Sequence, residues 1–114
     1  MKVWQDARSL AKCIYQISSV GKLSKDFGLR DQIQRASVSV MSNIAEGYER
    51  DSNKEFIKYL GYSKGSVGEV RSLLYVVLDN EYINENKFTE LFEQCVAISQ
   101  QLSNFEKYLR KSIR

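Results

Sequence analysis

Apolar residues recur every three or four positions through several long segments of this 114-residue chain, and this spacing restricts its fold more than any other feature. The spacing is clearest near the C-terminus, where it forms one stripe. The stripe consists of Phe88, Leu91, Phe92, Cys95, Ile98, Ser99, Leu102, Phe105 and Leu109. Asn84 is a suitable N-cap before it, and basic residues suit its C-terminal end. We therefore expect an amphipathic helix over about residues 84–111.

Three earlier segments show the same spacing, with breaks near residues 18–27, 47–53 and 80–86. The third segment opens at Ser52, whose distance along the chain from Glu55 is that of a capping box. The sequence contains no proline, whereas a β-rich chain of this length would normally use several. Four helices with short connections predict an all-α, antiparallel up-down-up-down four-helix bundle. Residues 1–114 are expected to form a single domain.

The segment RASVSVMSNIAEG, residues 35–47, alternates like a strand in its first half. No second alternating run exists to pair with it, so we expect a helix over about residues 28–48. Leu29, Val40 and Gly47 belong to one apolar stripe of this helix. A second stripe is displaced around the helix and consists of Val38, Met41, Ala45 and Tyr48. Two stripes indicate a helix covered on two sides, and the second is expected to contact another subunit.

In an antiparallel bundle, residues of the second and third helices whose numbers sum to about 101 lie at the same level. This places Arg35 near Glu69 and predicts an ion pair between the two helices. We interpret the polar residues at these levels as an internal hydrogen-bonded network rather than a catalytic pair. The expected members are Arg35, Asn43, Glu46, Ser66 and Glu69.

The third segment also contains Gly61, Gly65 and Gly68, each of which costs about 1 kcal/mol relative to alanine inside a helix. A flexible hinge is one interpretation. Because the apolar period continues through the glycines, we favour close approach by the backbone of a neighbouring helix.

The sequence has no histidine, which removes the commonest general base and a common metal ligand. Cys13 and Cys95 lack a CxxC partner and are expected to be reduced and buried. The glycine-rich phosphate-binding motifs GxGxxG and GxxxxGK(S/T) are both absent from the sequence. We therefore expect a protein that is not an enzyme, with no catalytic residue, cofactor or metal. A divalent cation held by copies of Glu46 or Glu69 at a ring axis is the enzymatic alternative.

The net charge of +3 permits contact with nucleic acid without demanding it. The candidate contacts are Arg8, Lys12, Arg30, Arg50, Lys54, Lys58 and Lys64, with Tyr48, Tyr59 and Tyr62 available for stacking. For each cation, an ordinary solvated surface is the alternative. The longest apolar run, residues 73–78, is too short to span a bilayer, and the N-terminus lacks a signal-peptide apolar region. We expect a cytoplasmic protein with no membrane partner.

Residues 27–47 contain the motif FGL..QI.RA..S...NIAEG, which is followed by Gly65, Ser66 and Glu69. This combination resembles the family of four-helix-bundle proteins encoded in intervening sequences of 23S ribosomal RNA genes. The resemblance implies a cytoplasmic bacterial protein that assembles as a ring, typically a homopentamer. It also implies a distant similarity to the accessory variability protein of diversity-generating retroelements, which binds nucleic acid and a reverse transcriptase. The family has no assigned catalytic residues, so none is carried over.

Two positions depart from the family pattern, which usually has one proline before the FGL motif and another between Ser39 and Asn43. This chain has neither, so its first loop is expected to differ in shape, and Met41 supplies a backbone donor. The resemblance and the charge together predict a non-catalytic ring that binds RNA or DNA through basic surface. The alternative is a protein-interaction scaffold with a protein partner and no direct contact with nucleic acid.

Overall fold

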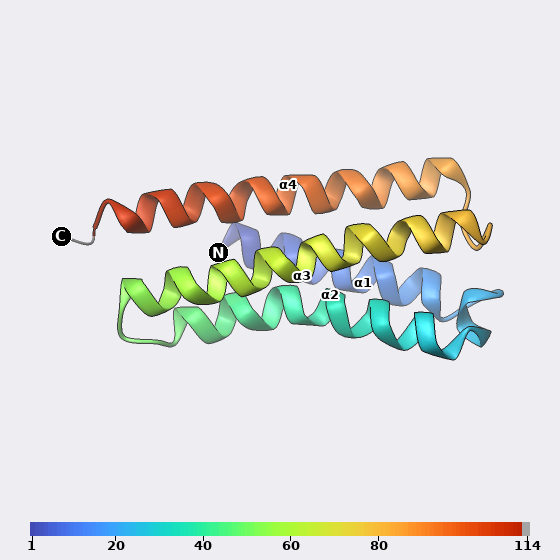
Figure 1. Ribbon diagram of the computed structural model, residues 1–114, viewed down its shortest axis with the longest axis horizontal. Helices are drawn as coiled ribbons and strands as arrows, with labels where there is room; N and C mark the ends of the chain where they lie inside the picture. The colour runs from blue at the N-terminus through green and yellow to red at the C-terminus, as the bar shows by residue number, and fades with distance from the viewer. Residues whose placement is uncertain (113–114) are drawn as a thin grey trace.

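The computed structural model describes residues 1–112 and shows these residues as an antiparallel bundle of four α-helices (Figure 1). The helices are α1 (Lys2–Ser18), α2 (Phe27–Tyr48), α3 (Asn53–Asp79) and α4 (Glu85–Arg110). A short 3-10 helix, η1 (Leu23–Lys25), lies in the connection between α1 and α2. The all-α bundle is confirmed, and the bounds predicted for the second and fourth helices differ from the observed ones by no more than one residue.

Side-chain caps begin three of the helices, and those at Ser52 and Asn84 were predicted from the sequence. Each cap accepts a hydrogen bond from the backbone amide three residues further on: Asp26 at 3.4 Å, Ser52 at 3.0 Å and Asn84 at 2.8 Å. Such caps satisfy otherwise unpaired amides and contribute about 1 kcal/mol each. At Ser52 half of the expected capping box forms, because the Glu55 carboxylate turns to Lys58 Nζ at 3.6 Å.

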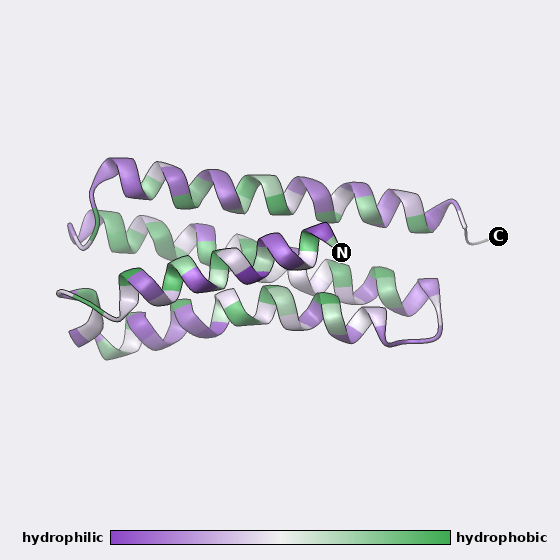
Figure 2. Ribbon diagram, turned by 180° about the vertical axis from the view of Figure 1, so that it is seen from behind, coloured by the Kyte–Doolittle hydropathy of each residue, from purple (hydrophilic) through white to green (hydrophobic). Residues whose placement is uncertain are grey.

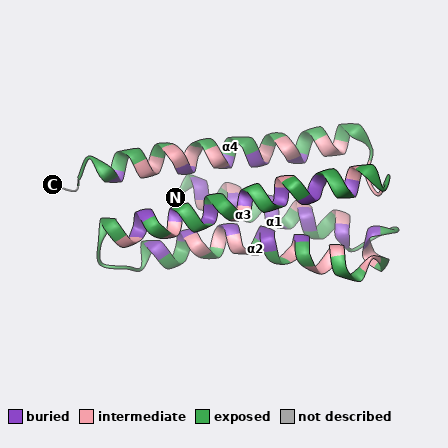
Figure 3. Ribbon diagram, viewed as in Figure 1, coloured by how far each residue is buried: buried purple, intermediate pink, exposed green. Residues whose placement is uncertain are grey.

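The core runs along the 50 Å long axis of the bundle, and each helix contributes one apolar face to it. Figure 2 shows apolar and polar residues alternating along each helix, and Figure 3 shows buried residues on the sides turned toward other helices. In α4 the buried residues are Leu91, Cys95, Ile98, Leu102 and Leu109. The C-terminal stripe read from the sequence is therefore the core face of α4.

Helices α2 and α3 approach each other closely beside the turn that joins them. Gly47 is buried there, and a Cβ atom at this position would lie 2.7 Å from Tyr59 Cβ and 2.9 Å from Phe56 Cδ1. Further along, the buried Ser63 Oγ donates a hydrogen bond to the Val40 carbonyl oxygen at 2.7 Å. The missing side chain and the small serine side chain together allow the two helix backbones to pack tightly.

The three glycines in the middle of α3 lie on its outer surface. A Cβ atom at Gly61, Gly65 or Gly68 would meet nothing within 4 Å. The predicted close approach of a neighbouring helix at these positions is therefore wrong. The apolar period continues through the glycines because they occupy the side of α3 opposite its core face, on which Leu60 and Val67 are buried.

Candidate nucleic-acid interface

The charged residues are distributed unevenly between the two halves of the chain. Residues 1–45 carry 7 Lys and Arg against 3 Asp and Glu, whereas residues 46–114 carry 10 against 11. The acid-free stretch from Ala7 to Lys25 covers most of α1 and all of η1. It contains Arg8, Lys12, Lys22 and Lys25. The positive net charge thus belongs to α1, α2 and the connection between them.

Two of the predicted contacts, Arg8 and Lys12, lie one turn apart on α1 and are exposed. Neither forms an ion pair with another residue in the range 1–112. They line a shallow hollow of about 410 Å³ together with Gln5, Asp6 and Ser9. The one acidic residue in this hollow, Asp6, is already hydrogen-bonded, because its carboxylate accepts from two other side chains. The donors are Lys2 Nζ at 2.7 Å and Gln101 Nε2 at 2.8 Å, and these bonds lower the pKa of Asp6.

Three other candidate cations are paired with carboxylates. Arg30 lies 2.9 Å from Asp31, Arg50 lies 3.4 Å from Glu46, and Lys58 lies 3.6 Å from Glu55. Lys54 and Lys64 are exposed and form no ion pair in the described part of the chain. A cation beside a carboxylate attracts a phosphate less strongly, so Arg8 and Lys12 on α1 and Lys54 and Lys64 on α3 present the more available charge.

Three of the predicted residues meet around the ring of Tyr59, where α2 ends and α3 begins. Arg50 Nη2 donates a hydrogen bond to Tyr59 Oη at 2.8 Å, and the Arg50 guanidinium lies 5.0 Å from the ring centroid. Lys58 Nζ lies 5.7 Å from the same centroid. The Tyr62 ring packs edge-on at 5.4 Å. Tyr59 is thus surrounded by its neighbours, whereas Tyr48 and Tyr62 remain exposed.

The predicted polar network is smaller than expected and is centred on Ser39. Asn43 Nδ2 donates to the Ser39 carbonyl oxygen at 2.9 Å and to Ser39 Oγ at 3.0 Å. Ser66 Oγ donates to Ser39 Oγ at 3.0 Å, which links α2 to α3. Glu46 lies outside this network and pairs with Arg50 on the surface.

The expected ion pair between Arg35 and Glu69 does not form among the described residues. Arg35 is exposed, and Glu69 instead accepts a hydrogen bond from Gln32 Nε2 at 3.3 Å. Gln32 precedes Arg35 by three residues and lies nearer to α3. The predicted height of this contact along the bundle was therefore close to the observed one. The side of α2 predicted to face Glu69 was wrong.

The second apolar stripe of α2 lies on the surface of the bundle. Val38, Ala45 and Tyr48 are exposed, and Met41 is partly buried against the core. No charged residue occurs from Ala36 to Ala45. A hollow of about 320 Å³ adjoins the stripe and is lined by Met1, Trp4, Ile44, Ala45, Tyr48 and Glu49. An uncharged face of this extent is accessible to a partner.

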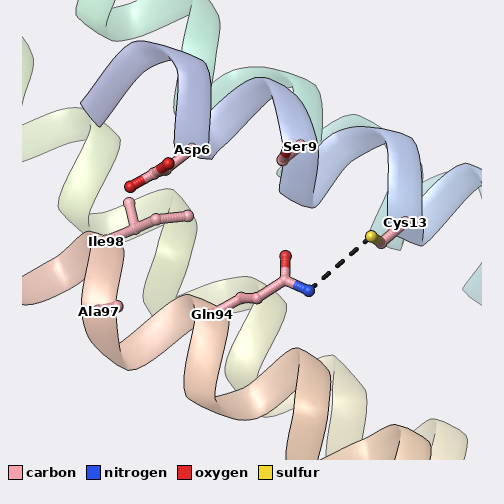
Figure 4. Close-up of a pocket in the computed structure, with 6 residues that line it drawn as sticks. All are labelled: Asp6, Ser9, Cys13, Gln94, Ala97 and Ile98. Carbon is pink, nitrogen blue, oxygen red and sulfur yellow. Dashed lines mark hydrogen bonds between the residues drawn. The ribbon is translucent and has the colours of Figure 1, made fainter. Parts of the chain in front are cut away.

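A groove lies between α1 and α4 (Figure 4). It has a volume of about 270 Å³ and is lined by Asp6, Ser9, Cys13, Gln94, Ala97 and Ile98. Gln94 Nε2 points to Cys13 Sγ at 3.8 Å. Cys13 is half-buried rather than buried, whereas Cys95 is buried as predicted, and burial raises its pKa to about 12. Residues 1–112 contain no cluster of three potential metal ligands.

The fold and its surface define a class of protein, an antiparallel four-helix bundle with a cationic first helix and an uncharged second-helix face. The chain matches the family described as 23S rRNA-intervening sequence protein over residues 1–104 and belongs to that family. The resemblance read from the sequence is thereby confirmed.

A solved structure supports the same fold. The crystal structure of a protein of unknown function from the S23 ribosomal protein family of Bacteroides thetaiotaomicron has a TM-score of 0.83 to this chain at 23% identity. The match covers 92% of this chain and 98% of the other. No curated protein matches the chain. No helix within residues 1–112 has the length and apolar character needed to cross a membrane.

Proposed function

We propose that this protein is a non-catalytic, ring-forming protein of the cytoplasm that binds RNA or another nucleic acid through basic surface. The observation that carries the proposal is the acid-free stretch from Ala7 to Lys25, in which Arg8 and Lys12 are exposed without ion pairs. The family description, which refers to the intervening sequences of 23S rRNA, supports RNA as the ligand.

Phosphate contacts by these cations release counterions, which is the main source of sequence-independent affinity. One chain with a net charge of +3 supplies a weak field. A pentamer carries about +15, and several contacts on one strand then add through effective concentration. The proposed ring thus turns a modest surface into a strong multivalent one.

The uncharged face of α2 supports the proposed self-association. Val38 and Ala45 expose apolar surface on the stretch from Ala36 to Ala45, which lacks any charged residue, and the exposed Tyr48 lies one turn beyond it. Burying such surface between subunits is favourable, whereas a wholly solvated helix normally carries charges on its outer face. The variant Ala45→Glu is expected to shift the chain to a monomer in light scattering at micromolar concentration. An unchanged mass would exclude this face as the subunit contact.

The nucleic-acid proposal is tested by a salt series of binding to structured ribosomal RNA and to single strands. The double variant Arg8→Gln, Lys12→Gln is compared with Arg50→Gln, Lys58→Gln, which removes the same charge from the carboxylate-paired cluster. Because each phosphate contact contributes about 0.7–0.9 to the slope of log K against log salt, the first variant is expected to lower the slope by about 1.4–1.8 for each subunit in contact. The second variant is expected to lower it less. No binding by the unmodified protein at low salt would refute the proposal.

The alternative function is a scaffold that contacts proteins and not nucleic acid, and the same uncharged α2 face favours it. Capture from a bacterial lysate with and without nuclease separates the two functions. A protein partner that stays bound after nuclease treatment, together with no affinity for purified RNA, would support the scaffold.

A further inference from the structure

We propose that the connection between α1 and α2 forms a stacking site for one unpaired nucleobase and its adjacent phosphate, centred on the Phe27 ring. This inference rests on the proposed function and specifies its ligand as single-stranded nucleic acid at this end of the bundle. The site lies at the opposite end of α2 from the Tyr59 cluster, where α1 leads into α2 in Figure 1.

Phe27 is the first residue of α2, and 64% of its surface is exposed. The Arg30 guanidinium lies over the ring, 4.8 Å from its centroid. Arg30 is itself fixed, because its Nη1 donates to the Ser24 carbonyl oxygen at 3.0 Å and its Nε lies 2.9 Å from Asp31 Oδ1. The ring is therefore held against a fixed cation and still presents most of its area to solvent.

Two lysines that the sequence reasoning did not select accompany this ring. Lys22 and Lys25 line a shallow hollow of about 480 Å³ with Asp26, Phe27 and Tyr82. Both lysines are exposed, and neither forms an ion pair with any residue that the structure describes. The hollow thus combines an exposed aromatic ring with two available positive charges.

The one acid that lines the hollow is engaged within the fold. Asp26 Oδ1 caps α2 by accepting from the Leu29 amide at 3.4 Å, and Asp26 Oδ2 accepts a hydrogen bond from Tyr82 Oη at 3.0 Å. The same hydrogen bond raises the pKa of Tyr82 above its ordinary value. Because both carboxylate oxygens have partners, Asp26 repels an incoming phosphate less than an unpaired carboxylate would.

A nucleotide offers the two features that this hollow complements, a flat π-face and a phosphate. An aromatic ring stacks on a base of any sequence, and nearby cations hold the backbone. Bases inside a duplex are stacked on one another and cannot be reached in this way, so the geometry favours a single strand or a loop. The Tyr59 ring is a poorer platform, because Arg50 and Tyr62 already pack on it.

The experiment measures binding of a uridine oligonucleotide and of a hairpin duplex of equal length to the full chain. The variant Phe27→Ala is expected to weaken binding of the oligonucleotide about tenfold, to leave duplex binding unchanged and to preserve the salt slope. Tyr108→Ala is the matched control, since Tyr108 is 67% exposed near the C-terminal end of α4. Lys22→Gln, Lys25→Gln is expected to lower the salt slope for both ligands.

Each outcome separates this site from the proposed function. If the unmodified chain binds no nucleic acid, both proposals fail. If it binds and Phe27→Ala changes neither affinity nor the single-strand preference, the stacking site alone is wrong. If the same variant loses its oligomeric mass in light scattering, Phe27 is a subunit contact and the site is likewise refuted. Competition by uridine monophosphate against the oligonucleotide would support the stacking chemistry.

Discussion

The α2–α3 interface and the α1–α4 interface are packed in different ways. Between α2 and α3, a buried glycine and a buried serine bring the backbones together, and Ser39 joins the helices through a further hydrogen bond. Between α1 and α4, the side chains leave a groove of about 270 Å³. Across that groove, Gln101 donates to Asp6 at 2.8 Å and Gln94 approaches Cys13 at 3.8 Å.

This difference indicates where the bundle opens first. A seam with few buried apolar contacts and solvent-exposed hydrogen bonds has the lower local stability. The helix at that seam, α1, is also the one that carries the unpaired cations Arg8 and Lys12. The cationic surface therefore lies beside the more open of the two interfaces.

The largest expected effect is the difference in reactivity between the two thiols. Cys13 faces the α1–α4 groove and is half-buried, whereas Cys95 is fully buried. A disulfide reagent such as Ellman's is expected to label Cys13 without unfolding. Cys95 should react more slowly by a factor of about 5,000 or more, because its labelling requires opening of a core worth about 5 kcal/mol or more.

The labelling is measured on the native chain and again in urea, where both thiols should react at similar rates. The variant Cys13→Ser removes the fast phase and serves as the control for its assignment. Equal native rates for the two thiols would mean that the α4 core face at Cys95 is as accessible as the α1–α4 groove at Cys13.

The next effect concerns the α2–α3 interface, the tight seam of the bundle, and is tested by the variant Gly47→Ala. The added methyl group would lie closer than 3.0 Å to Tyr59 and Phe56, so the helices must move apart. Overpacking of this kind costs about 3 kcal/mol, and the higher helix propensity of alanine returns about 1 kcal/mol. We expect a net loss near 2 kcal/mol in urea unfolding.

The matched control is Gly65→Ala, which makes the same change on the outer surface of α3. Because a Cβ atom there meets nothing within 4 Å, the propensity term acts alone. The variant is expected to gain about 0.5–1 kcal/mol. If both alanines had the same effect, the close approach at Gly47 would not be the cause.

The opposite changes in unfolding free energy expected for these two variants illustrate how far the sequence predicts the fold. The apolar period and the caps gave the helices and their ends, because both are local properties. The period also placed Gly47 on the inner stripe of α2. It did not show which glycines touch a neighbour, since that depends on how each helix is rotated against its partner, and Gly61, Gly65 and Gly68 were assigned to the wrong side.

The candidate site was predictable in part for a similar reason. The cations were visible in the sequence, but their pairing was not. Whether Arg50 reaches Glu46, or Arg30 lies over Phe27, depends on side-chain conformations that composition does not fix. A sequence signal did exist for Lys22 and Lys25, namely the acid-free stretch to which they belong.

A smaller effect is expected from Ser63→Ala in the tight seam. The variant removes the hydrogen bond from Ser63 Oγ to the Val40 carbonyl oxygen and leaves that oxygen to its own helix. The net cost of such a bond is about 1 kcal/mol. Urea unfolding measures it beside Gln101→Ala, which removes the part-buried hydrogen bond to Asp6 between α1 and α4. A loss for Gln101→Ala equal to or larger than that for Ser63→Ala would break the comparison.

The smallest effect is a dependence of folding stability on pH at the α1–α4 interface. Hydrogen bonds from Lys2, first, and from Gln101 lower the pKa of Asp6 in the folded chain below its unfolded value. A lowered carboxyl pKa stabilises the fold above the unfolded pKa of about 4, and this contribution is lost as the pH falls through the folded pKa. The Asp6 side chain is 39% exposed, so after solvent screening we expect only about 0.3 kcal/mol.

Asp6→Asn isolates this contribution, since it removes the charge and keeps an oxygen that accepts from Gln101. The stability difference from the unmodified chain should be present at neutral pH and shrink below about pH 4. A difference that stays constant with pH would mean that packing, and not ionisation, holds α1 to α4. A difference as large as that of Ser63→Ala would mean that the ionised Asp6, through Lys2 of α1 and Gln101 of α4 together, contributes as much as the hydrogen bond between α2 and α3.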